Sequence, residues 1–259
     1  MASFKSWYSY NSFSHHVRNK YRYRFDSETK LFLETVKKTA GNKVKHFAKG
    51  ECLYRAQEGC DNELEFIEDI NDHIEHEKPY CMERMLPNPE YSYEGRANPK
   101  GIAVLYVATH YHTAICEMRP WKNKVYTVAR MDLNRDIKVI DCTRSGGRRL
   151  YFSTEENPEP KPRAMNRIVW SWINSAFSEP ASRHNSSTDY VPTQILAEVF
   201  RSEGYDGILY SSNFDTKGDN LALFDKSCVT PIFGKVVNIT KAEVDYEEIS
   251  GPHASTKYM

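Results

Sequence analysis

Two arginines in this sequence stand in settings that suit the binding of an anion. Arg55 lies in the segment LYRAQ, which has the pattern of a strand, and Arg96 lies in the glycine-containing segment GRANPKG just before an apolar run. A guanidinium presents a planar fork of donors that matches phosphate or carboxylate, and its burial is costly unless it is paired. The alternative for either residue is a surface salt bridge, which the sequence alone leaves open.

Tyr106 and Glu117 supply a phenol and a carboxylate in the next two segments. Tyr106 ends the apolar run IAVLY, and Glu117 lies in AICEMRP, a short predicted helix that is apolar just before this residue. A carboxylate held in such surroundings could stabilise a cationic transition state or accept a proton. The other interpretation is an acid on the helix surface that pairs with Arg119 or Lys122.

The other polar segments argue against two kinds of site. Ser211 and Ser212 follow GILY without a G-x-S-x-G turn, so a serine-hydrolase triad is disfavoured. The histidine pairs in HIEH (73–76) and HYH (110–112) match no zinc-binding spacing, and we predict no metal site. The loop RSGGRR (144–149) is interpreted as a solvated loop, with an anion-binding nest as the alternative.

Composition limits the class of protein further. The 35 basic residues balance the 35 acidic ones, and a net charge of zero argues against a general nucleic-acid binder. The six cysteines form no C-x-x-C pair, which suits reduced thiols better than a disulfide framework. No apolar stretch has the length of a membrane span or the core of a secretory signal. We therefore expect a cytoplasmic protein without membrane contact.

The elements that must position these residues are a mixture of strands and helices. Strands are predicted at 51–57, 102–109, 125–133, 136–142, 205–212 and 220–225. Helices are predicted at 26–42, 110–120 (with Thr109 as cap), 163–177 and 191–204, an exposed helix or loop at 61–78, and a long loop at 81–101. There is no regular βα repeat, and no G-x-G-x-x-G follows a strand. The pattern predicts an α+β domain of short twisted sheets with flanking helices.

The chain divides into three parts by composition and pattern. Residues 1–48 are expected to form an N-terminal helical extension, residues 49–235 the main domain, and residues 236–259 a polar C-terminal tail.

Five segments, taken in order, resemble the RES domain family, which is named for an arginine, a glutamate and a serine. They are LYRAQ (53–57), GRANPKGIAVLYVAT (95–109), AICEMRP (114–120), DYVPTQILAEVF (189–200), and GYDGILYSS with GDNLALF (204–224). The order of five segments is far more specific than any one of them. The similarity spans roughly residues 50 to 226, and relative to the family pattern residues 143–188 resemble an insertion in the main domain.

The resemblance implies a fold like that of ADP-ribosyltransferases and an activity on NAD. Bacterial members of the family are typically toxins that deplete NAD, and an antitoxin with an Xre-like helix-turn-helix commonly restrains them. NAD is then the substrate, and no cofactor is expected. A homodimer or another partner could use the N-terminal extension.

The resemblance also assigns residues by position. The family arginine falls on Arg55, its glutamate on Glu117 and its serine on Ser212, which fits the pattern G-I-x-Y-x-S better than Ser211 does. Further expected site residues are Arg96, Tyr106 and Asn220.

These assignments imply how the nicotinamide–ribose bond would be broken. Its cleavage builds positive charge on the sugar, which Glu117 could face. Arg55 and Arg96 would bind the pyrophosphate, and Tyr106 would stack on nicotinamide or ribose. Ser212 and Asn220 would hydrogen-bond the ribose or the carboxamide.

Three functions remain open on the sequence. In the first, water or phosphate captures the ribosyl group, so that the enzyme is an NAD glycohydrolase or phosphorylase. In the second, ADP-ribose is transferred to a protein or nucleic acid, with RSGGRR or the insertion as the acceptor surface. The third is an inactive NAD-binding regulatory module.

Overall fold

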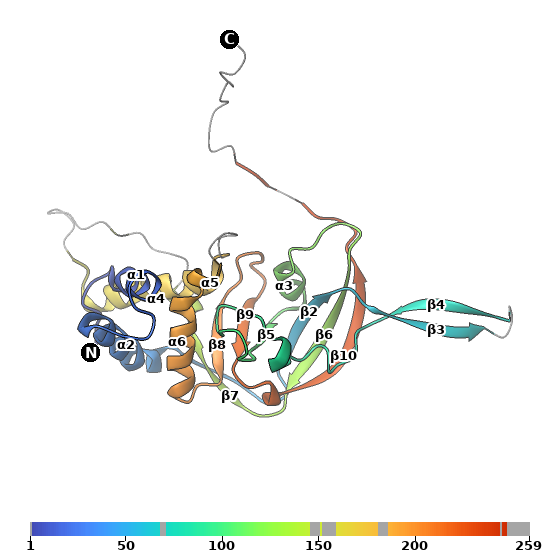
Figure 1. Ribbon diagram of the computed structural model, residues 1–259, viewed down its shortest axis with the longest axis horizontal. Coiled ribbons are helices and arrows are strands. Elements are labelled where there is room, and N and C mark those ends of the chain that lie inside the picture. The colour runs from blue at the N-terminus through green and yellow to red at the C-terminus, as the bar shows by residue number, and fades with distance from the viewer. Residues whose placement is uncertain are drawn as a thin grey trace, which may run out of the picture.

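A mixed sheet of eight strands forms the centre of the molecule (Figure 1). This computed structural model describes residues 2–67, 71–145, 151, 159–180, 186–243 and 245–247. The strands of the sheet are β1 (Val44–Phe47), β2 (Cys52–Glu58), β5 (Leu105–Ala108), β6 (Val125–Leu133), β7 (Ile137–Asp141), β8 (Gly207–Ser211), β9 (Asp219–Leu223) and β10 (Val229–Asn238). Their order is β1-β7-β8-β9-β5-β2-β6-β10. Only β7 and β8 run parallel among these paired strands.

Helices cover the β7–β8 end of this sheet. They are α1 (Ser9–Asn19), α2 (Ser27–Ala40), α4 (Pro162–Ser178), α5 (Ser186–Asp189) and α6 (Val191–Ser202), while α3 (Tyr111–Glu117) lies against β2 and β5. Figure 1 shows α1, α2, α4 and α6 gathered at one end of the molecule. The separate grouping of helices and a largely antiparallel sheet confirms the predicted α+β class. No helix among the described residues combines the length and apolarity that a bilayer crossing needs.

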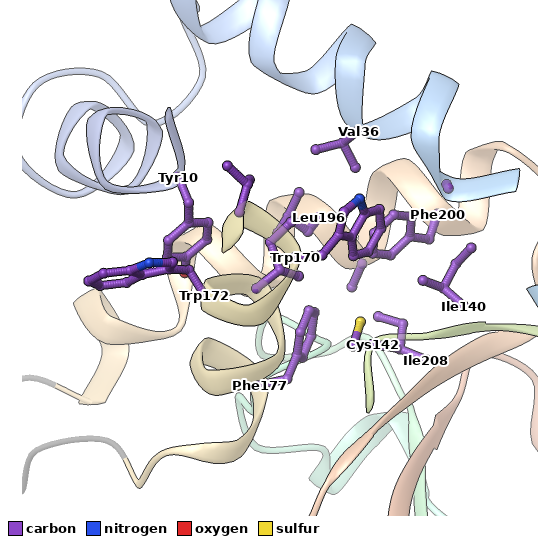
Figure 2. Close-up of a cluster of buried hydrophobic side chains, with 14 of the residues drawn as sticks. Tyr10, Val36, Ile140, Cys142, Trp170, Trp172, Phe177, Leu196, Phe200 and Ile208 are labelled. Carbon is purple, nitrogen blue, oxygen red and sulfur yellow. The ribbon is translucent and has the colours of Figure 1, made fainter. Parts of the chain in front are cut away.

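The largest hydrophobic core lies between these helices and the sheet (Figure 2). Trp170 of α4 stacks on Phe200 of α6 with ring centroids 6.1 Å apart. Val36 approaches the pair from α2, and Ile140 and Ile208 approach it from the sheet. The predicted helices 163–177 and 191–204 are confirmed, and their apolar stripes are the faces that form this core.

The N-terminal segment is built into the same core. Phe13 of α1 is 1% exposed and stacks on Phe32 of α2 at 4.6 Å. Asp26 caps α2 by accepting a hydrogen bond from the Thr29 amide, as the sequence predicts. The next strand, β1, pairs with β7 at the edge of the main sheet. The described residues up to 48 contain α1 and α2, and they also contribute an edge strand and part of the core.

Residues 61–78 differ from the sequence interpretation of an exposed helix or loop. They form the hairpin of β3 (Asp61–Ile67) and β4 (Asp72–Lys78), which projects from the body of the molecule (Figure 1). Leu64 and Phe66 alternate with glutamates, which is the two-residue period of a strand. The dense acidic charge hid this period.

Three further details add to the sequence interpretation. Helix α3 is capped by His110, whose side chain accepts from the His112 amide, and not by Thr109. Strand β10 runs to Asn238, past the expected start of the polar tail at 236. The described part of the expected insertion 143–188 includes α4, which lies in the core.

We expect Phe13→Ala to lower the free energy of unfolding by about 3–5 kcal/mol, because it opens a cavity beneath α1. Leu31→Ala on α2, where the side chain is 53% exposed, should change it by no more than about 0.5 kcal/mol. Urea unfolding followed by circular dichroism measures both. An unchanged midpoint for Phe13→Ala would show that α1 is not part of the cooperative core.

Candidate active site

One cavity of about 310 Å³ collects five of the six site residues that the sequence predicts. Its lining includes Arg55, Arg96, Tyr106, Glu117 and Asn220. They come from β2, the loop before β5, β5 itself, α3 and β9 respectively. Since β9, β5 and β2 are neighbours in the sheet, residues far apart in the sequence meet here.

The carboxylate of Glu117 is held by two donors. The Ser212 hydroxyl donates to Glu117 Oε1 at 2.6 Å, and Asn220 Nδ2 donates to the same oxygen at 2.7 Å. Ser212 Oγ itself accepts from the amides of Phe214 and Asp215, both at 3.1 Å, so its proton is directed at the carboxylate. Glu117 Oε2 has no hydrogen-bond partner among the described residues. The acid is thus oriented through one oxygen while the other is available to a ligand.

The two adjacent serines have different partners. Ser212 donates its hydroxyl hydrogen bond to Glu117. Ser211 instead contacts Asn174: its Oγ accepts from Asn174 Nδ2 at 3.2 Å, and its backbone amide donates to Asn174 Oδ1. The structure therefore brings Ser212, and not Ser211, into the site. Ser212 does not line the cavity, and it acts on the site by orienting Glu117.

The guanidinium of Arg55 lies in the cavity with no acidic side chain paired to it among the described residues. No hydrogen bond or ion pair of its side chain is found among the described residues, and its Nη1 is a buried donor without a partner. Burial lowers the pKa of Arg55 from 12.5 to about 10. A buried guanidinium without a carboxylate is unfavourable unless a ligand supplies the missing negative charge.

Arg96 is more tightly engaged by the protein than a free anion-binding group would be. Its Nη1 donates to the carbonyls of Ala176 and Glu179 at the C-terminal end of α4, and its guanidinium lies 5.8 Å from the ring centroid of Tyr190. The unpaired carbonyls at a helix C-terminus attract cations, which explains this position. Arg96 therefore lines the cavity, but its Nη1 is already hydrogen-bonded to the backbone.

Tyr106 uses its hydroxyl to hold the glycine-containing loop. The phenol donates to Asn98 Oδ1 at 2.7 Å and accepts from the Ala97 amide at 2.9 Å. Burial raises the pKa of Tyr106 well above its usual value. The hydroxyl is therefore engaged and neutral, and the ring is what Tyr106 presents to the cavity.

Asn98 and Gln194 support the site and were not singled out by the sequence. Asn98 Nδ2 donates to the carbonyls of Tyr93, Pro99 and Ile102, and Gln194 Nε2 donates to those of Gly95 and Asn98, both at 3.0 Å. Both residues stand in segments that carry the family resemblance. The partners of Asn98 lie in the same loop, whereas Gln194 contacts this loop from α6. Only the tertiary structure shows that they fix the loop.

A comparison with protein-family models identifies the family of the chain. The model of the RES domain family matches residues 72–240, so the chain belongs to the RES domain family. The matched range begins after Arg55, which reaches the site through the pairing of β2 with β5 and β6.

Among solved structures, the chain is similar to one in the crystal structure of the M. tuberculosis MbcT-MbcA toxin-antitoxin complex. The identity is 12%, the TM-score is 0.40, and the match covers 78% of this chain and 91% of that chain. No curated protein matches the sequence.

A matched pair of glycine substitutions tests the loop that carries Arg96. A Cβ at Gly95 would lie 2.6 Å from Tyr106 Oη and 2.9 Å from Asn98 Oδ1, whereas one at Gly41 would meet nothing within 4 Å. We expect Gly95→Ala to lower the free energy of unfolding by about 1–3 kcal/mol through overpacking. Gly41→Ala, at helical dihedral angles, should leave it unchanged or raise it by about 0.4–1 kcal/mol. Equal melting temperatures for the two variants would contradict this packing.

Proposed function

We propose that this chain cleaves the nicotinamide–ribose bond of NAD and thereby depletes it. The observation that carries the proposal is the unpaired guanidinium of Arg55 in the same cavity as the oriented carboxylate of Glu117. A dinucleotide with an anionic diphosphate and a cationic nicotinamide ribose offers a partner to each group. Membership of the RES domain family supports an enzyme that acts on NAD.

The diphosphate of NAD would satisfy Arg55. Phosphate oxygens accept from a guanidinium at about 2.7–2.9 Å, and such charge-assisted bonds are roughly twice as strong as neutral ones. Arg55 Nη1 has no protein acceptor as an alternative partner among the described residues. Binding of the substrate would relieve the cost of burying this charge. Arg96, which lines the same cavity, would supply its remaining donors to the same anion.

Glu117 would act on the ribose. When the glycosidic bond breaks, its electron pair leaves with neutral nicotinamide, and positive charge develops on the sugar. The free Oε2 of Glu117 can face that charge or accept a proton from a ribose hydroxyl or from the attacking water. Ser212 and Asn220, which both donate to Oε1, hold the carboxylate in place for this role.

The ring of Tyr106 would line the side of the cavity that the nicotinamide ribose enters. Its hydroxyl is occupied by Asn98 and Ala97, so we assign it contact and positioning rather than proton transfer. The acceptor would be water, giving ADP-ribose, nicotinamide and a proton, or inorganic phosphate, giving the ADP-ribosyl phosphate and nicotinamide.

Transfer of ADP-ribose to a macromolecule is the second candidate, because it uses the same NAD site. Of the RSGGRR loop expected as its acceptor surface, residues 146–149 lie outside the described residues, and Arg144 pairs with Asp141. An inactive NAD-binding module would not need the two hydrogen bonds that orient Glu117, so this orientation disfavours that function. An antitoxin of the Xre type and a homodimer remain predictions of the family resemblance.

The reaction is tested with purified protein, NAD and no macromolecular acceptor, in buffers with and without phosphate. We expect nicotinamide release, with the mass of the ADP-ribosyl product identifying water or phosphate as the acceptor. Glu117→Gln should lower kcat by about 10²–10³-fold, since it removes the charge but keeps the shape and the bonds to Oε1. Glu198→Gln, on the exposed side of α6, is the matched control and should be fully active.

Two outcomes of this experiment contradict the proposal. Full activity of Glu117→Gln would remove the carboxylate from the mechanism. Nicotinamide release that occurs only after a protein or nucleic acid is added would replace NAD depletion by ADP-ribosyl transfer.

Two substitutions at Arg55 separate its function from its effect on stability. Arg55→Lys should raise KM for NAD about 10- to 100-fold, because a point charge cannot replace the bidentate fork. Arg55→Met should abolish saturable NAD use while keeping or raising the melting temperature, since it replaces a buried unpaired charge by an apolar group. Arg130→Lys on β6, where the arginine is paired with Asp132, is the control and should keep the parent KM. A normal KM for Arg55→Lys would remove Arg55 from substrate binding.

A further inference from the structure

On the helix that carries Glu117, one face of α3 and the loop after β8 bring a histidine, a cysteine and an aspartate together. His112 and Cys116 are four residues apart on the helix, and Asp215 comes from the loop. One candidate ligand atom from each residue lies within 4.8 Å of the other two. We propose that His112, Cys116 and Asp215 form a binding site for a divalent transition-metal ion of the zinc class. This inference is independent of the proposed reaction on NAD.

The distances between the donor atoms fit a tetrahedral ion. His112 Nδ1 lies 3.2 Å from Asp215 Oδ2 and 3.4 Å from Cys116 Sγ. Zinc bonds of about 2.0–2.1 Å to nitrogen and oxygen and about 2.3 Å to sulfur give tetrahedral edges of about 3.3 Å and 3.6 Å for these two pairs. The third pair, Cys116 and Asp215, lies within 4.8 Å, so a side-chain shift of no more than about 1 Å would let an ion contact all three residues. Water would take the fourth position.

The chemistry of the donors selects the class of ion. A thiolate, an imidazole and a carboxylate together favour zinc and its neighbours, whereas magnesium and calcium prefer sites made of oxygen alone. Binding would release the thiol proton of Cys116, and the two negative ligands would then neutralise the ion. Exchange of the thiol proton for a divalent ion changes the net charge of the site from −1 to 0, so the occupied site next to Glu117 is neutral.

The surrounding bonds already orient the aspartate. Thr113 donates to Asp215 Oδ2 at 2.6 Å, and the Lys217 amide donates to Oδ1 at 3.2 Å. The side chain of Asp215 is only 6% exposed, while that of His112 is 50% exposed, so an ion can enter from the His112 side. Hydrogen-bonded ligand carboxylates of this kind are typical of metal sites.

An ion at this position would join the two elements that hold the candidate catalytic acid. Cys116 directly precedes Glu117, and the Asp215 amide donates to Ser212 Oγ, which in turn donates its hydroxyl hydrogen bond to Glu117 Oε1. The metal would therefore cross-link α3 to the loop 212–215 and stabilise the folded chain by mass action. The sequence did not indicate this site, because the third ligand lies about a hundred residues from the other two.

Cobalt(II) added to the reduced full chain is the test, since it replaces zinc and reports its ligands by absorption. We expect one equivalent to bind, with a thiolate-to-cobalt charge-transfer band, intense visible bands of a tetrahedral ion, and a higher melting temperature. Zinc should displace the cobalt, and magnesium or calcium should not. Cys116→Ser should lose the charge-transfer band, and His112→Ala and Asp215→Asn should each weaken binding at least 10-fold.

Cys81→Ser and His46→Ala are the matched controls, because both residues are exposed and remote from α3 in the sequence. Both should bind cobalt as the parent chain does. Circular dichroism of each variant without metal verifies its fold, and His112→Ala is an exposed substitution that should leave it intact. A charge-transfer band that persists in Cys116→Ser, or cobalt affinity unchanged in His112→Ala, would overturn the proposal. None of these readouts involves NAD.

Discussion

The buried guanidinium of Arg55 is the constraint around which the site is built. Burial moves its pKa from 12.5 to about 10, which corresponds to a cost of about 3 kcal/mol for keeping the charge in the cavity. This is a large fraction of the stability of a typical domain. The chain keeps the charge without a carboxylate beside it among the described residues, although it pairs Arg18, Arg130, Arg135 and Arg144 with aspartates elsewhere. Such an arrangement is expected where the missing anion is a ligand.

The rest of the fold makes this constraint possible. Strand β2 lies between β5 and β6, so the backbone around Arg55 is fixed on both sides. Glu117 is oriented by Ser212, which directly follows β8, and by Asn220 of β9. Helix α4 contributes from the core side, because its Asn174 fixes Ser211 and the carbonyls at its C-terminal end hold Arg96. The segment that resembled an insertion thus serves as a structural support of the site.

Much of the site was predictable because its residues lie in short segments whose order identifies the family. Arg55, Tyr106, Glu117, Ser212 and Asn220 stand in those segments, and the structure brings them together. The helices with apolar stripes and the apolar strands were also predictable, since a local period reports which face is buried. Both kinds of signal are contained in the sequence itself.

The features that escaped prediction depend on individual side-chain contacts, or lie in segments whose polar residues obscure a local period. The residues around Tyr106 do not indicate that its hydroxyl donates to Asn98. Those around His112 do not indicate that its ring contacts Asp215. Helix α1 was missed because the polar and basic residues around Tyr10, Phe13 and Val17 obscure their helical spacing. The hairpin β3–β4 was hidden because its outward charges outweigh the alternation of Leu64 and Phe66.

A crystal structure of the Glu117→Gln variant with NAD tests the central claim most directly. The account predicts a dinucleotide in the cavity of about 310 Å³, with a diphosphate oxygen about 2.7–2.9 Å from Arg55 Nη1 and the nicotinamide ribose against residue 117. A dinucleotide bound elsewhere, or one in this cavity that leaves Arg55 Nη1 without a partner, would contradict it.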